Sequence, residues 1–126
     1  MQMTRRELKA LFTKKTNLFN SEQTLTALKE SFEIFRTSDE GVDHVNRDIS
    51  ILEEKIRRER IAIAEQEIHA RETLKPIEDD AARIGAMLHY CEGMPWDIAA
   101  AVLRYISGNA LREAAYRGMD AAKIAK

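Results

Sequence analysis

The sequence predicts an all-α protein on two observations. Apolar residues recur every seven positions without a gap from residue 42 to residue 91, and a period of seven keeps a row on nearly the same face of a helix with about 3.6 residues per turn. The composition is typical of long helices, since 33% of the 126 residues are charged and only five are Gly and two are Pro. The row consists of Val42, Ile49, Ile56, Ile63, Ala70, Ile77, Ile84 and Cys91.

Two N-terminal helices are expected within residues 1–37. Thr4 and Glu7 fit a capping box, in which each side chain accepts a hydrogen bond from the backbone of the other residue at the start of a helix. Asn20–Ser21 are turn and cap residues, so we expect the first helix to end there and a second to cover residues 22–37. The second helix carries an apolar stripe, formed by Leu25, Leu28, Phe32 and Phe35.

A loop over residues 38–41 is predicted to lead into a long helical stem over about residues 42–92. The seven-residue row makes the stem coiled-coil-like, with a seam buried against a partner helix. Pro76 kinks or breaks it, because a proline inside a helix removes one backbone hydrogen bond and clashes with the preceding turn. Either the stem is one kinked rod, or one helix ends near Leu74 and another begins with Pro76 at its first position. The unbroken row favours a kink or a tight break that keeps the two segments in line.

A small cluster of helices is expected over residues 94–126, which completes a single helical domain over residues 1–126. A helix over about 95–107 precedes a short helix that Gly118 ends. The spacing of a small residue, this glycine and an apolar anchor matches part of a helix-turn-helix, which lays its second helix in the major groove of DNA. A plain helix pair that closes the domain is the alternative.

No catalytic or ligand-binding motif is found in the chain. The three histidines are far apart, the glycines are scattered, and no nucleophile lies in a recognisable motif. A lone cysteine cannot form an internal disulfide, which favours a reducing compartment, and no run of 18 apolar residues suggests a membrane span. We therefore predict a cytoplasmic protein that is not an enzyme and has no metal, cofactor or membrane partner.

The predicted function is protein–protein binding, as an adaptor, an inhibitor or an assembly factor. The helix over residues 22–37 can fold back over part of the stem but is too short to cover the row, so we expect a homo-oligomer, most simply a dimer whose seam is that row. Ile61 and Ile68 fall close to the opposite side of the stem. They are the candidate surface for a second, unidentified protein partner.

The alternative is a dimeric nucleic-acid-binding regulator that uses the C-terminal helix pair or the basic N-terminal segment. Residues 1–20 hold five cations against one acid, and a basic amphipathic segment of this kind is suited to phosphate groups. An ordinary solvated helix face is the competing interpretation of the same charges. The candidate nucleic-acid contacts are Arg5, Arg6, Lys9, Lys123 and Lys126.

Overall fold

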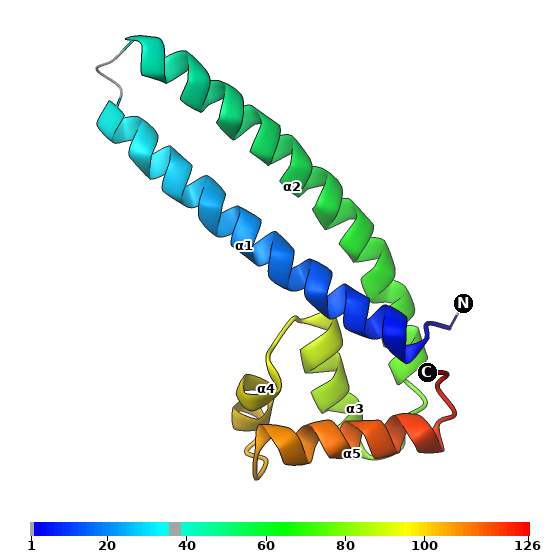
Figure 1. Cartoon of the computed structure of the whole chain (residues 1–126). Coiled ribbons are helices and arrows are strands. Elements are labelled where there is room, and N and C mark those ends of the chain that lie inside the picture. The colour runs from blue at the N-terminus through cyan, green and yellow to red at the C-terminus, as the bar shows by residue number, and fades with distance from the viewer. Residues whose placement is uncertain (1, 36–38) are drawn as a thin grey trace. The chain divides into compact units, whose positions relative to one another are not determined.

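The protein is all-helical in the part that its computed structural model describes, which is residues 2–35 and 39–126, with the side chains of residues 2–33 and 44–126 (Figure 1). None of the described helices is both long enough and apolar enough to cross a bilayer. The all-α prediction is confirmed. The elements are α1 (Arg5–Phe35), α2 (Asp39–Leu74), α3 (Asp80–Ala86), the π-helical turn η1 (Met87–Cys91), α4 (Trp96–Val102) and α5 (Gly108–Ala121).

The chain divides into two compact units. The core unit contains residues 1–15 and 63–126, and the hairpin unit contains residues 16–62. Helices α1 and α2 each contribute to both units. Within the hairpin unit they run antiparallel (Figure 1), and an ion pair of 3.3 Å between Arg60 Nε and Glu22 Oε1 joins them.

Helix α1 begins at the predicted capping box. The Thr4 N–H donates to Glu7 Oε1 at 3.1 Å, and the Glu7 N–H donates to Thr4 Oγ1 at 3.2 Å. These two bonds satisfy donors that the first turn of a helix leaves free. The predicted capping box is therefore confirmed.

The predicted break in the N-terminal region is wrong, because α1 continues through Asn20–Ser21 to Phe35. The Thr24 hydroxyl donates to the Asn20 carbonyl at 3.0 Å, a bond made within a continuing helix. An apolar row with seven-residue spacing crosses the expected break and lies at least half-buried on both sides of it, so packing overrides the weak turn preference of two residues. This row is formed by Leu11, Leu18, Leu25 and Phe32.

The predicted loop over residues 38–41 is also wrong in its extent, because α2 already begins at Asp39. Ser38 lies outside the described residues. The side chain of Val42, the first member of the seven-residue row, lies outside them too.

The stem is broken near Pro76. The predicted end of a helix near Leu74 is confirmed, whereas the kinked rod and the helix start at Pro76 are wrong. Helix α2 ends at Leu74, so the stem is not one kinked rod. Helix α3 does not begin at Pro76 but at Asp80, where the side chain of Asp79 accepts a hydrogen bond of 2.8 Å from the Ala82 N–H. A carboxylate at this position satisfies a free donor of the first turn, which a proline cannot do.

Helices α3 and α4 both pack against α5 in the core unit. Helix α5 is capped by Ser107, which accepts from the Ala110 N–H at 3.1 Å, and it continues through Gly118 to Ala121. Gly118 does not end the helix, because it is needed for a close approach: a Cβ there would lie 2.8 Å from Ile77 Cγ2. The predicted C-terminal helix pair, and the helix-turn-helix with it, is therefore wrong.

Helix α4 is shorter than the predicted helix over residues 95–107. It covers Trp96–Val102, and the chain then turns through Arg104, whose φ of 54° lies in the left-handed region. A non-glycine residue in this region cannot continue a right-handed helix. Before α4, Gly93 has a φ of 75°, which glycine adopts without strain.

Three stacked aromatic rings pack within the core unit. His89 of η1 lies between Phe12 of α1 and Trp96, with ring centroids 4.1 and 4.0 Å away and nearly parallel planes. His89 Nδ1 lies 2.6 Å from the Met94 carbonyl oxygen. Burial lowers the pKa of His89 from 6.5 to about 4, so the stack contains a neutral imidazole at neutral pH.

Candidate functional site

The predicted oligomer seam, the seven-residue row of apolar residues, varies along its length in how far its side chains are exposed. Its buried members belong to a single folded chain and need no second chain to cover them, whereas Ile49 is half-buried and Ile84 is 41% exposed. The proposed oligomer seam stays a prediction, with Ile49 and Ile84 as the described members available to it. The buried members are Ile56, Ile63, Ala70, Ile77 and Cys91.

The hairpin unit leaves much of its own seam partly open. Leu18 and Ile56 are buried, but the other apolar residues that face each other along this pair of helices are covered on one side only. Two helices alone bury a seam less completely than a larger bundle does, because each side chain has neighbours from only one other helix. The half-buried residues are Leu25, Leu28, Phe32, Val45, Ile49 and Leu52.

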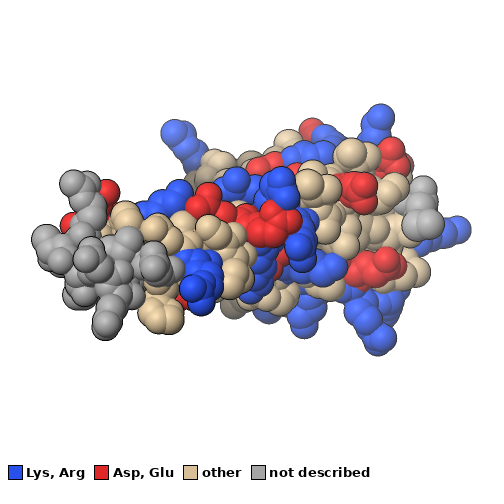
Figure 2. Space-filling model, turned by 90° about the horizontal axis from the view of Figure 1, so that it is seen from above, with Lys and Arg blue, Asp and Glu red and all other residues tan. Residues whose placement is uncertain are grey.

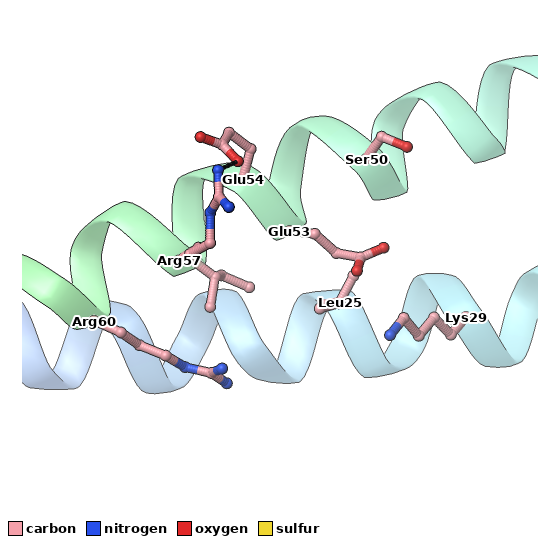
Figure 3. A pocket seen from close by; sticks show the side chains of 8 residues that line it. Leu25, Lys29, Ser50, Glu53, Glu54, Arg57 and Arg60 are labelled. Carbon is pink, nitrogen blue, oxygen red and sulfur yellow. Dashed lines mark hydrogen bonds and ion pairs between the residues drawn. The ribbon is translucent and has the colours of Figure 1, made fainter.

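A groove of about 570 Å³ lies between the two helices of the hairpin unit (Figure 3). Leu25 of α1 and Ile56 of α2 give it an apolar floor. Glu53 and Arg60 extend from α2 toward α1, as Figure 3 shows. The rest of the rim is polar and contains Lys29, Ser50, Glu54 and Arg57.

The charges at this groove are mixed in sign. Glu54 pairs with Arg57 and, at 3.1 Å, with Arg58. Hydrogen bonds from Arg57 and then Arg58 lower the pKa of the Glu54 carboxyl below its usual value, although exposed pairs of this kind add little to stability. Acidic and basic side chains are also interspersed over the face seen in Figure 2.

Ile61 and Ile68, the candidate partner surface, are not part of the core. They are 62% and 60% exposed and lie seven residues apart on α2. Ile61 belongs to the hairpin unit and Ile68 to the core unit, and single exposed apolar side chains are common on protein surfaces. The exposure of Ile61 and Ile68 keeps the partner-surface hypothesis open.

The candidate nucleic-acid contacts are brought together except for Lys123. Arg5, Arg6, Lys9 and Lys126 line one cavity of about 480 Å³ in the core unit, whereas Lys123 is not among its lining residues. From the sequence, the basic N-terminal segment and the C-terminal residues were separate alternatives. The remaining lining residues, Tyr90 and Tyr116, were not predicted, since no sequence spacing relates them to the cations.

The lone cysteine has no reactive environment. Cys91 is fully buried, and burial raises the pKa of its thiol to about 11, so little thiolate exists at neutral pH. Lys15 donates from Nζ to the Cys91 carbonyl oxygen and also pairs with Glu67. Among the side chains of residues 2–33 and 44–126, no group of three His, Cys, Asp or Glu residues is arranged to hold a metal ion.

No known protein family, characterised protein or solved structure matches this chain. Its fold and surfaces define a small all-helical protein with an open groove in the hairpin unit and a basic cavity in the core unit. Any functional conclusion therefore depends on these two sites and on the exposed face of α2.

Proposed function

We propose that this protein acts by binding other macromolecules, as an adaptor, an inhibitor or an assembly factor, and that its hairpin unit associates with a second copy of the chain. The partly open seam of the hairpin unit is the observation that supports this proposal. Two such hairpins form a four-helix bundle when their open sides meet, and each then covers the half-buried residues of the other.

The charges around the groove favour a second copy as its occupant. The rim contains both Lys29 and Arg60 and the acids Glu53 and Glu54. A two-fold axis brings the same patch of each chain against the other, so a patch must offer both signs of charge to be complementary to itself. A rim of one sign would instead repel its copy.

Self-association is tested by the mass and shape of the chain in solution. Light scattering coupled to size exclusion should give twice the 14.4 kDa of one chain, with partial dissociation on dilution. Leu25→Glu places a charge on the groove floor and should give a monomer, while Gln23→Glu adds the same charge on the exposed side of α1 and should leave the dimer intact. A wild-type mass of 14.4 kDa at all concentrations would exclude self-association of the hairpin unit.

The partner surface on α2 is tested separately from self-association. Ile61→Asp with Ile68→Asp should leave both helix content and dimer mass unchanged, since the two side chains are exposed. The same double variant should abolish binding of a protein partner. If it dissociates the dimer, these isoleucines belong to the interface between copies instead.

The second candidate function is nucleic-acid binding, now through the basic cavity alone. The predicted helix-turn-helix is absent because α5 continues through Gly118. The observation that favours this candidate is the convergence of Arg5, Arg6, Lys9 and Lys126 on one cavity.

A further inference from the structure

The basic cavity is built by segments from distant parts of the sequence. Arg5, Arg6 and Lys9 come from the start of α1, Tyr90 from η1, Tyr116 from α5, and Lys126 from the segment after α5. All six residues belong to the core unit. The cavity is therefore a product of the tertiary fold of that unit.

Arg5 holds these segments in place. Its backbone N–H donates to the Ala125 carbonyl at 2.7 Å, its Nε donates to the Ile124 carbonyl at 3.1 Å, and its guanidinium pairs with Asp120 at 2.5 Å. Because Arg5 is already engaged, it is a positioning residue: it brings the residues after α5 beside the start of α1.

The other three cations have no acidic partner among the residues that the structure describes. Arg6, Lys9 and Lys126 are exposed, and none of the residues that the structure describes forms an ion pair with them. Three like charges around one cavity repel each other, and an anion that enters it relieves that repulsion. Phosphate suits such a site, because its oxygens accept several charge-assisted hydrogen bonds at once.

Tyr90 brings a hydroxyl group to the lining of the cavity. The residue is only 4% exposed, and among the described residues no fully buried side-chain oxygen lacks a hydrogen-bond partner. Burial, with a smaller contribution from Tyr116, raises the pKa of Tyr90, while Arg5 opposes this shift. The hydroxyl therefore stays protonated and can donate a hydrogen bond to a ligand that enters the cavity.

Tyr116 supplies an aromatic surface beside the cations. It is 43% exposed and lines the same cavity. Exposed aromatic rings next to a basic groove are the arrangement that proteins use to bind the bases of single-stranded nucleic acid, because every base has a face that can stack.

We infer that this cavity binds a nucleotide, free or within a single strand, with its phosphate at Arg6, Lys9 and Lys126 and its base against Tyr116. The inference extends the second candidate function and does not depend on self-association. A phosphate alone would use the cations but not the tyrosine ring. A nucleotide uses both.

The test measures binding of a fluorescent single-stranded oligonucleotide at low salt, with a mononucleotide and inorganic phosphate as competitors. Arg6→Gln with Lys9→Gln should weaken binding at least tenfold and lower the salt slope by about 0.7 for each phosphate contact removed. Lys14→Gln with Lys75→Gln is the matched control, because it removes two exposed cations of the core unit outside the cavity. This control should change the affinity less than twofold.

A second variant, Tyr116→Leu, separates base stacking from charge. It should weaken the oligonucleotide and the mononucleotide about tenfold and leave the salt slope and any phosphate competition unchanged. The mononucleotide could compete while the oligonucleotide binds no more tightly than the mononucleotide does. In that case the cavity is a nucleotide site, and the proposed nucleic-acid function fails. Three results would overturn the inference. They are a loss of affinity in the matched control equal to that of Arg6→Gln with Lys9→Gln, an unchanged affinity of Tyr116→Leu, and no binding at low salt.

Discussion

The same two helices behave differently in the two units of this chain. In the core unit, Leu8, Leu11 and Leu74 of α1 and α2 are completely buried. In the hairpin unit, the equivalent apolar positions, such as Leu25 and Leu52, are only half-buried. The core unit adds α3, η1, α4 and α5, and contacts such as the stacking of Phe12 on His89 bring these elements against α1. Apolar periodicity thus specifies which face of a helix is buried, and the number of neighbouring elements decides how completely.

Truncating a leucine in each unit should give the largest difference. Leu111→Ala removes a fully buried side chain from the cluster with Ala99 and Ala100, and should lower the free energy of unfolding by about 3 kcal/mol. Leu25→Ala in the hairpin unit should cost about 1 kcal/mol when measured on the dissociated chain at high dilution, because in the single chain its side chain already meets water. Urea unfolding followed by circular dichroism measures both. Equal losses would show that the hairpin unit is as tightly packed as the core unit.

The ring stack should make the core unit sensitive to acid. The pKa of His89 falls from 6.5 in the unfolded chain to about 4 in the folded chain, so the unfolded chain binds more protons between these values. The free energy of unfolding is therefore unaffected by His89 protonation above pH 6.5. It falls by roughly 3 kcal/mol as the pH decreases from 6.5 towards 4. Urea unfolding at a series of pH values should reveal this slope.

His89→Phe is the control for the acid response. It keeps an aromatic ring between Phe12 and Trp96 but has no titrating group. The variant should therefore lose most of the pH dependence between 6.5 and 4.5. A slope equal to that of the wild type would assign the response to carboxylates elsewhere in the chain.

The smallest expected effect concerns the turn between α2 and α3. Pro76 is exposed, and the turn around it is closed by a hydrogen bond of 3.1 Å from the Ile77 N–H to the Leu74 carbonyl. Pro76→Ala should lower the free energy of unfolding by about 0.5 kcal/mol, because alanine gives the unfolded chain more freedom. Thermal unfolding should detect this beside Lys75→Ala as the exposed control. A more stable Pro76→Ala variant would mean that the proline strains the turn.

The sequence predicts the fold class and the capping box because both depend on local patterns. It fails at Asn20–Ser21, where polar side chains lie on a helix whose apolar face continues past them. It fails again at Gly118, whose lack of a side chain serves contact with Ile77 rather than the end of a helix. In both cases, tertiary packing decides between two local conformations that the residue types alone leave open.

The basic cavity shows the same limit for a binding site. Its cations could be picked out as candidates, since charge is visible in a sequence. That Lys126 lies with Arg6, and that Tyr90 and Tyr116 complete the lining, depends on how α1, η1 and α5 pack. Lys123 was a reasonable candidate on charge alone, but the chain after α5 does not bring it to the cavity.

The ring stack has an optical consequence. Trp96 is the only tryptophan in the chain, and its indole lies 4.0 Å from the His89 ring. Indole emission responds to the polarity of its surroundings and is quenched by a neighbouring imidazolium. The chain therefore contains an intrinsic fluorescent reporter that detects opening of the core unit and protonation of His89. Its emission does not respond to changes confined to the hairpin unit.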